Sequence, residues 1–188
     1  MKNYNGGFTL EMISYRELIK NEIELSLFSS FNRYQEVNRC WRKEKEEWVL
    51  KNIQFVENWS RQDYEYLIKC LKNTIETGGT VYGALKNNAL VGFASLESQF
   101  FGSKKEYLQL SSIHISFDER GKGIGKKLFC LVCEKAKEMG AKKLYISAHS
   151  SEETQAFYKK MGCIETIEYN ESLVAKEPYD CQLEYNLL

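Results

Sequence analysis

The chain has 188 residues, and its 26 Lys and Arg residues balance its 26 Asp and Glu residues. A formal net charge of zero disfavours nucleic-acid binding, because such proteins carry a basic excess or a basic stripe. No apolar run approaches the roughly 18 residues of a membrane-spanning helix, and the first residues lack the apolar stretch of a signal peptide. We therefore expect one cytoplasmic domain over residues 1–188, with no membrane or nucleic-acid partner.

The N-terminal third predicts few regular elements. Phe8–Ile13 has the composition of a short first strand, and Arg16–Phe28 favours a helix although its apolar period is blurred. Residues 30–59 interleave three tryptophans with charged residues and indicate no period.

The pattern becomes clearer from Ser60 onward. Ser60 begins a helix as its N-cap, with Asp63 at the capping-box position, and two glycines end that helix. A β-hairpin is expected next, in which the strands Thr80–Leu85 and Ala89–Leu96 are joined by the turn at 86–88.

The C-terminal half alternates strands and helices. The expected elements are a loop at Phe100–Lys105, a strand at Tyr107–Ser116, a helix at Gly123–Met139, a strand at Lys143–Ser147, a helix at Glu152–Met161 that ends at Gly162, and strands at Ile164–Tyr169 and Cys181–Leu187. This order predicts an α+β fold with a mixed central sheet of about six to seven strands flanked by helices.

The cysteines indicate neither a disulfide framework nor a metal site. A chain of this length without a signal peptide is expected to keep its thiols reduced. Cys130 and Cys133 have the spacing of zinc and redox pairs, but they lie in a strongly helical segment and no second pair follows. We expect buried helix cysteines and no metal.

A glycine-rich loop lies between the strand at Tyr107–Ser116 and the helix at Gly123–Met139. Glycines let the backbone approach a ligand, the free N–H groups of a helix start favour an anion, and basic side chains add positive charge. The loop is therefore a candidate phosphate or pyrophosphate site, although a glycine-rich helix start without a ligand is the alternative. Its residues are Arg120, Gly121, Lys122, Gly123, Ile124, Gly125 and Lys126.

Two common phosphate motifs do not match this loop. The dinucleotide fingerprint GxGxxG would need a glycine at Lys126. The P-loop motif would need a glycine at Arg120 and Ser or Thr at Lys127.

The loop instead matches the pattern [Q/R]xxGx[G/A], and at this point the sequence resembles the GNAT superfamily of N-acyltransferases. In that family the pattern holds the pyrophosphate of coenzyme A, so the resemblance implies acetyl-CoA as co-substrate. It also implies a sheet that splays at its central strand, whose main chain pairs with the pantetheine arm. The implied cofactor contacts are Ile113, Ile115, Arg120, Gly121, Lys122, Gly123, Ile124, Gly125, Lys126 and Ser151.

A second block supports the resemblance. Lys143–Ala148 is similar to the next family strand, and Glu152–Cys163 is similar to the family's FYxxxGF helix end, with Cys163 where Phe is common. Ser151 stands where the family often has Asn. By resemblance, Tyr158 is the general acid that protonates the leaving thiolate, although a core tyrosine at a helix end is the alternative. The resemblance covers about residues 81–163, which form the expected cofactor-binding core.

The general base is not evident. An amine with a pKa near 10.4 must lose a proton before it attacks a thioester. Members of the family that the chain resembles often place Glu or His on the central strand, on the face that alternation gives to Ile113 and Ile115. Those positions here are Gln109 and Ser111, and neither is a base. His114 alternates with these residues and is expected to face away from the acceptor. Glu97 and Glu106, at strand ends, are weaker alternatives for the base. We therefore expect a base that acts through water.

The acceptor is not identified by the sequence. The segment at about 14–77 is expected on the acceptor side, where the aromatic residues of 31–59 either wall a pocket or pack against helices. Glu177, Asp180 and Glu184 either attract a cationic amine or form a solvated acidic loop.

We expect an N-acetyltransferase that passes the acetyl group of acetyl-CoA to a primary amine of a small molecule or peptide, by direct attack in a ternary complex. A non-catalytic acyl-CoA-binding sensor is the alternative, which the lack of an evident base favours. Nucleotide or nucleic-acid binding through the basic loop is disfavoured by the zero net charge. A homodimer is a further expectation.

Overall fold

The computed structural model describes residues 12–187, so the strand expected at Phe8–Ile13 lies almost wholly outside the described residues. The first described strand, β1, is Ile13–Glu17. The expected helix at Arg16–Phe28 is wrong, because β1 is followed only by two 3₁₀ turns, η1 (Lys20–Glu22) and η2 (Leu25–Phe28). The buried side chains of this segment recur every five residues, at 18, 23 and 28, which an α-helix of 3.6 residues per turn cannot keep on one face.

The described residues form a seven-stranded mixed sheet in the order β1-β4-β5-β6-β7-β9-β8. All neighbouring pairs are antiparallel except β6 and β7, which run parallel. This architecture confirms the predicted fold class. The strands beyond β1 are β4 (Thr80–Lys86), β5 (Ala89–Leu96), β6 (Tyr107–Ile115), β7 (Lys143–Ala148), β8 (Ile164–Glu165) and β9 (Cys181–Asn186).

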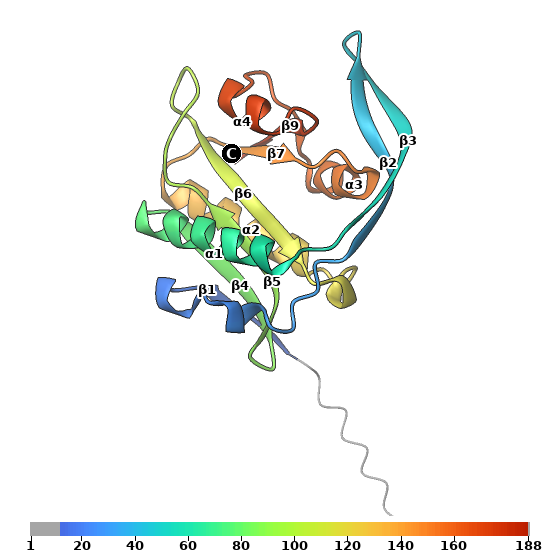
Figure 1. Ribbon diagram of the computed structural model, residues 1–188. Helices are drawn as coiled ribbons and strands as arrows, with labels where there is room; N and C mark the ends of the chain where they lie inside the picture. The colour runs from blue at the N-terminus through green and yellow to red at the C-terminus, as the bar shows by residue number, and fades with distance from the viewer. Residues whose placement is uncertain (1–11, 188) are drawn as a thin grey trace, which may run out of the picture.

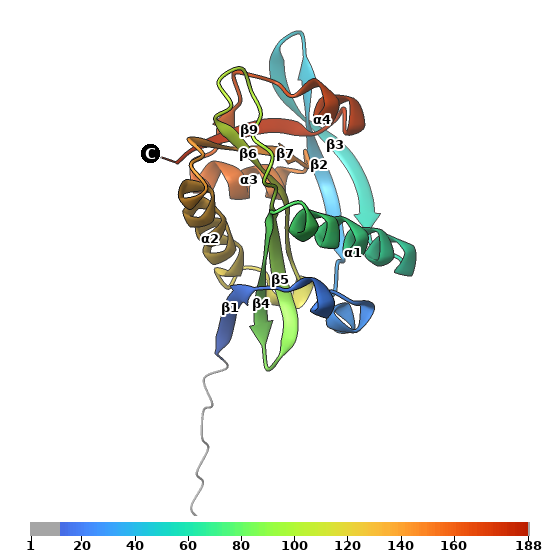
Figure 2. The same ribbon diagram turned by 90° about the vertical axis from the view of Figure 1, so that its left-hand side faces the viewer.

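Residues 30–59 form a long separate hairpin of β2 (Gln35–Glu44) and β3 (Glu47–Glu57). Its turn places Lys45 and Glu46 at positive φ. The segment therefore supplies a β-ribbon where the sequence shows no period. Figures 1 and 2 place this hairpin on the α1 side of the sheet, beside the open ends of β6 and β7.

Helices cover both faces of the sheet. Figure 2 shows α1 on one side of the strands and α2 on the other. The predicted capping box of α1 is confirmed, since the Ser60 side chain accepts from the Asp63 N–H and the Asp63 side chain accepts from the Ser60 N–H. The helices are α1 (Arg61–Glu76), α2 (Ile124–Glu138), α3 (Glu152–Met161) and α4 (Glu171–Lys176). None of these described helices is long and apolar enough to cross a membrane.

The region after α3 differs from the expected pair of long strands. β8 ends at Glu165, because the Thr166 hydroxyl and the Ile167 N–H turn toward the buried carboxylate of Glu184. Asn170 then caps α4, a helix that the sequence analysis missed, by accepting from the N–H groups of its first turn. The chain thus turns back over the sheet before β9 begins.

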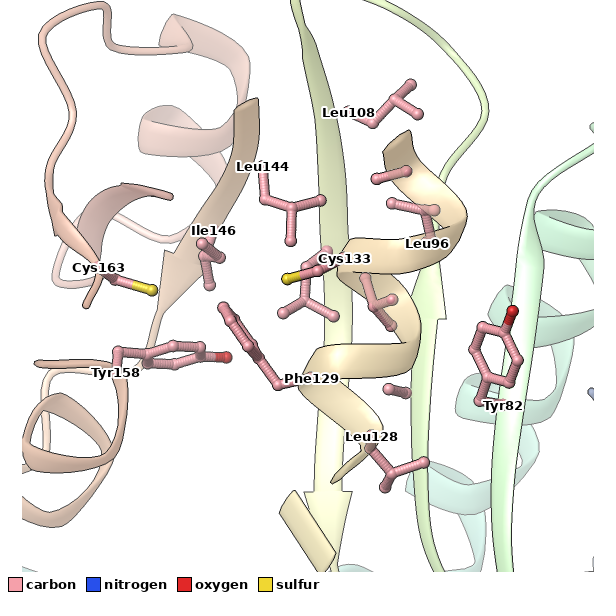
Figure 3. Close-up of a cluster of buried hydrophobic side chains, with 14 of the residues drawn as sticks. Tyr82, Leu96, Leu108, Leu128, Phe129, Cys133, Leu144, Ile146, Tyr158 and Cys163 are labelled. Carbon is pink, nitrogen blue, oxygen red and sulfur yellow. The ribbon is translucent and has the colours of Figure 1, made fainter. Parts of the chain in front are cut away.

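The core has two parts. One apolar cluster lies between the sheet and α2, and Figure 3 shows its side chains, including Leu128, Phe129 and Tyr158. The other lies between the sheet and α1 and contains Phe28 and Phe93. Together they cover both faces of β4 and β5, whereas β6 contributes Leu108 and Leu110 only to the cluster on the α2 side.

Both cysteines of the predicted pair lie on α2, but Cys130 is only partly buried. Cys133 is buried, and this burial raises the pKa of its thiol to about 12, so the thiolate needed for redox or metal chemistry is disfavoured. Between residues 12 and 187, no three potential metal ligands gather into a site.

The sheet opens between β6 and β7. These strands pair only through Tyr107, Leu108 and Gln109, opposite 143–145, and beyond Gln109 they diverge. Figure 1 shows β6 leaving β7 toward the C-terminal end of both strands. The expected splay at the central strand is therefore present.

Candidate active site

The glycine-rich loop, residues 120–126, lies at the end of β6 and is called the glycine cradle below. Gly121 and Gly123 both have positive φ, 76° and 82°, a conformation that glycine adopts at little cost. A Cβ added at either position would meet no atom within 4 Å. These glycines are therefore needed for backbone shape, and they leave space in front of the loop that a ligand can fill.

The start of α2 offers unpaired backbone donors to that space. Gly123 is the N-cap, no side chain caps the helix, and its first turn carries no acidic residue. The first helical hydrogen bond runs from the Lys127 N–H to the Gly123 carbonyl, so the preceding N–H groups have no partner within the helix. Such a terminus attracts anions, and phosphate oxygens in particular.

The remaining loop residues divide into packing groups and charged groups. The Ile124 side chain is buried in the core, so only its main chain can reach a ligand. Gly125 lies against α3, where a Cβ would come within 3.2 Å of the Phe157 ring. Lys126 is exposed and has no ion-pair partner among residues 12–187. It is the loop cation that is most available to an incoming phosphate.

Arg120 and Lys122 are engaged elsewhere in this structure. The Lys122 ammonium pairs with the Glu119 carboxylate at 2.9 Å and donates to a main-chain carbonyl. The Arg120 Nε–H donates to the Ile115 carbonyl at 3.2 Å, and its guanidinium lies over the Phe117 ring. Burial and the neighbouring Arg33 lower the pKa of Arg120. Both side chains must exchange these contacts before they can bind an anion.

The main chain of β6 faces the splay at the expected residues. The Ser116 N–H donates to the Val91 carbonyl of β5, which fixes the direction of alternate backbone groups along β6. The N–H and C=O groups of Ile113 and Ile115 therefore point away from β5, into the gap toward β7. Their side chains pack on the α2 side of the sheet.

Tyr158 lies on α3, in the apolar cluster beside α2. Its ring is buried on α3 against Phe129 and Phe157, and burial raises the pKa of its hydroxyl. Figure 3 shows the hydroxyl pointing away from α3 toward α2. The hydroxyl has no hydrogen-bond partner within 12–187. Every fully buried side-chain oxygen in that range has a partner, so this hydroxyl keeps access to solvent. The raised pKa keeps this hydroxyl protonated at neutral pH, so that it is present as a hydrogen-bond donor.

Ser151 is placed differently from the other expected contacts. It is fully buried, its hydroxyl caps α3 by accepting from the Thr154 N–H, and Gln35 of the hairpin donates to it. An isolated bridge also joins Ser151 to Cys40 of β2. The side chain is enclosed by the hairpin, so in this structure its role is to fix the α3 terminus.

An open cavity of about 860 Å³ lies on the opposite side of β6, between α1, β6 and α4. A second cavity of about 360 Å³ adjoins it and shares Asn73, Glu97, Gln109 and Leu173 with it. Their size suits a small organic ligand. The larger cavity has the aromatic residues Trp59 and Tyr66 and the charged residues Asp63, Lys69, Glu97, Lys176 and Glu177 in its walls.

A β-bulge in β6 changes which side chains face this cavity. The β5–β6 register shifts between Ser95 and Leu96, which leaves Ser111 as the extra residue. Gln109 and Ser111 line the cavity as expected, but beyond the bulge the alternation is reversed. His114 therefore faces the cavity, and the expectation that it faces away is wrong.

The Glu97 carboxylate is hydrogen-bonded to Ser111, the extra residue of the bulge. Its Oε1 accepts hydrogen bonds from the Ser111 hydroxyl at 2.6 Å and from the Thr74 hydroxyl at 2.8 Å. Its Oε2 has no partner among the described residues and the side chain lines both cavities. Glu106, the other expected alternative, instead pairs with Lys143 at 3.8 Å.

The acidic residues near the C-terminus take three different positions. Glu177 lines the larger cavity. Asp180 accepts from the Ser147 hydroxyl on β7, and burial raises the pKa of its carboxyl. Glu184 is buried and accepts from Tyr107 and Lys143. Glu184 therefore joins the strands of the sheet, and the expectation that it attracts an amine is wrong.

Of the three tryptophans in the 30–59 segment, only Trp59 lines the cavity. Trp48 donates from its indole N–H to Glu165, outside the cavity. The sequence analysis missed Tyr66 and Leu173 as wall residues. The amphipathic period of α1 gives the signal for Tyr66, because this exposed residue lies beside its buried positions.

Comparisons with known proteins agree with this geometry. The model of the Acetyltransferase (GNAT) family matches residues 34–163. A comparison with curated proteins found no match.

Three solved structures illustrate the likeness. Nourseothricin acetyltransferase has a TM-score of 0.68 at 14% identity, over 94% of this chain and 99% of that chain. A GNAT-family acetyltransferase from Staphylococcus aureus Mu50 has a TM-score of 0.61 at 20% identity, over 94% and 100%. The PaiA N-acetyltransferase from Thermoplasma acidophilum, in complex with coenzyme A, has a TM-score of 0.57 at 15% identity, over 93% and 99%. At these identities the likeness shows the fold alone, whereas the family match spans most of the chain. The protein belongs to the GNAT family of acetyltransferases.

Proposed function

We propose that the protein transfers the acetyl group of acetyl-CoA to a primary amine of a small molecule or peptide, by direct attack in a ternary complex. One observation carries this proposal: the open glycine cradle, the splay between β6 and β7, and a ligand-sized cavity meet along a single strand. Cofactor and acceptor can therefore approach the same strand from its two sides.

Acetyl-CoA fits the donor side. The pyrophosphate would meet the unpaired N–H groups of α2 and the free ammonium of Lys126. The pantetheine arm would pair with the main chain of Ile113 and Ile115, which points into the splay. Arg120 would then leave the Ile115 carbonyl and turn to the phosphates. Membership of an acetyltransferase family supports acetyl as the group transferred.

Tyr158 is the proposed general acid. When the amine nitrogen bonds to the acyl carbon, the carbon–sulfur bond breaks and the sulfur leaves as a thiolate. The Tyr158 hydroxyl is accessible to solvent and has no competing hydrogen bond within 12–187, so it can give a proton to that sulfur.

Glu97 is the proposed general base, in place of the water relay expected from sequence. Its free Oε2 can take a proton from the acceptor ammonium, while Ser111 and Thr74 hold Oε1. This carboxylate in the acceptor cavity weakens the case for a non-catalytic sensor, which rested on the absence of a base.

Three further expectations stay predictions: a single domain over 1–188, a cytoplasmic location and a homodimer. The acceptor side is proposed to include α4 as well as residues 14–77, because Leu173, Lys176 and Glu177 line the cavity.

The test combines calorimetry with acetyl-CoA and release of free thiol against polyamines, aminoglycosides, amino acids and short peptides. Saturable binding with thiol release for one amine class is the expected result. Binding without release for any amine would favour the sensor. No binding of acetyl-CoA would refute the cofactor assignment.

A further inference from the structure

The geometry points to a second recognition element in the acceptor cavity: His114 is a fixed hydrogen-bond donor that binds an oxygen atom of the acceptor. This inference rests on the proposed function for the identity of the cavity. The inference also narrows the chemical class of the acceptor, because the acceptor must carry a hydroxyl, ether or carbonyl oxygen at a distance from its reacting amine.

The proton position on His114 follows from its partner. The Arg33 Nε–H donates to His114 Nδ1 at 3.2 Å. A guanidinium has only donors and stays protonated, so Nδ1 must be the acceptor of this bond. The neutral imidazole therefore carries its proton on Nε2.

Arg33 itself cannot easily move. Its guanidinium donates to the Glu57 carboxylate at 2.8 Å and to the Gln35 side-chain oxygen at 3.0 Å. It also lies over the Trp59 ring, 5.2 Å from the centroid, and only 8% of the residue is exposed. All three guanidinium nitrogens are engaged, so the tautomer of His114 is held by a rigid anchor.

The ring of His114 is also fixed in orientation. It packs edge-on against Trp59 at 4.9 Å and in a tilted arrangement against Phe93 at 5.4 Å, both measured between ring centroids. Burial, followed by the charges of Arg33, Arg120 and His149, lowers the pKa of His114 to about 3. The ring therefore stays neutral at physiological pH and acts as a donor on the cavity side.

The Nε2–H opens into the cavity. His114 lines the cavity wall, and Nε2 has no hydrogen-bond partner within residues 12–187. No buried side-chain nitrogen in that range is without a partner, so Nε2 is accessible to solvent. An accessible donor that the protein leaves unused is available to a ligand oxygen.

The spacing along β6 defines the class of acceptor. The amine is placed at Glu97 beside Ser111, and His114 lies three residues further along the strand, so the Cα atoms of Ser111 and His114 are at most about 10 Å apart at roughly 3.3 Å per residue. An amino sugar or a lysine-containing peptide can present an amine and an oxygen over this distance. Spermidine, which has no oxygen, cannot use the donor.

The first measurement is the tautomer and its response to ligands, by ¹⁵N-resolved NMR of the two histidines in the full-length protein. A His149→Gln sample assigns the two rings. We expect the Nε2–H tautomer at His114, unchanged between pH 5 and 8. An Nδ1–H tautomer would overturn the inference.

Titration of the same sample with kanamycin, a lysyl peptide and spermidine tests binding independently of catalysis. We expect kanamycin or the peptide, but not spermidine, to shift the His114 Nε2 signal. If neither oxygen-bearing amine shifts it, the inference is wrong. If a shift occurs without thiol release for any amine, the recognition role stands and the proposed enzymatic function fails.

Kinetics separate the role of the donor from a structural role. His114→Ala is expected to lower the ratio of kcat/KM for the preferred oxygen-bearing amine over that for spermidine by about tenfold, the value of one hydrogen bond. The loss should appear mainly in KM, and His114→Gln, which keeps a donor, should recover part of it. An equal loss for both amines would show that His114 acts only on the fold.

Discussion

Gly123→Glu gives the sharpest test of the phosphate cradle. The backbone at Gly123 has φ +82°, and a side chain there would enter open space in front of the unpaired N–H groups of α2. The new carboxylate would meet the pyrophosphate without a steric clash against the protein. The loss of affinity therefore has a steric part, because any side chain fills space that the ligand can use, and an electrostatic part that only the carboxylate adds.

The size of the effect can be worked out. A carboxylate about 5 Å from one phosphate charge costs about 3 kcal/mol at an effective dielectric constant of about 20. This corresponds to a loss of roughly 100-fold or more in the affinity for acetyl-CoA. The left-handed backbone strain costs about 1–2 kcal/mol of stability for any side chain.

Two controls isolate the charge. Gly123→Gln carries the same strain without the carboxylate, and Gly140→Glu places a carboxylate at the other end of α2, where φ is +95° and the space is also open. We expect all three variants to melt at similarly reduced temperatures, and calorimetry to show that Gly123→Glu binds acetyl-CoA about 100-fold or more weakly than Gly123→Gln does. If Gly123→Glu binds as tightly as Gly123→Gln, the cradle does not hold the phosphates.

Three further predictions concern the residues around the splay and the cavity. Tyr158→Phe should lower kcat about 100-fold while the calorimetric affinity for acetyl-CoA and the melting temperature change little, because the hydroxyl has no hydrogen bond to lose within 12–187. Glu97→Gln should lower turnover at pH 7 by about 100-fold or more with acetyl-CoA binding retained, and turnover at the wild-type level would exclude Glu97 as the base. Because the folded pKa of His114 is about 3 and the unfolded value about 6.5, the unfolded chain binds more protons between these values, and stability falls as the pH is lowered from about 6.5. Urea unfolding at pH 7 and pH 4.5 should therefore show a smaller difference for His114→Gln than for the wild type, and an equal difference would contradict the shift.

The donor side could be predicted from sequence because its signals are local. The expected helix at Glu152–Met161 matches α3, since Ser151 caps its start and Gly162 ends it with φ 93°. The turn between β4 and β5 likewise forms at Asn87 and Asn88, both at positive φ. Caps, glycines and turns fix the backbone within a few residues, so no distant contact is needed to locate them.

The acceptor side could not be predicted in the same way, because one extra residue in β6 exchanges the faces on which all later side chains of that strand lie. The extra residue at Ser111 reverses the alternation that placed His114 on the far face. Nothing in the local sequence marks this bulge, since it results from the register with β5. The same register brings the Ser111 hydroxyl to Glu97, a contact between residues 14 positions apart.

The hairpin explains why the acceptor residues lie outside the motifs. The Phe117 N–H donates to the Asn32 carbonyl at the end of β6, and the Trp41 N–H donates to the Ser150 carbonyl beside α3. The segment before α1 therefore spans the two diverging strands and carries Arg33 to His114. The part of the chain that carries the family motifs forms the site for acetyl-CoA. The orientation of His114, by contrast, depends on Arg33, which lies in a segment without a motif. Substitutions in this segment can therefore change acceptor preference while the cofactor cradle stays the same.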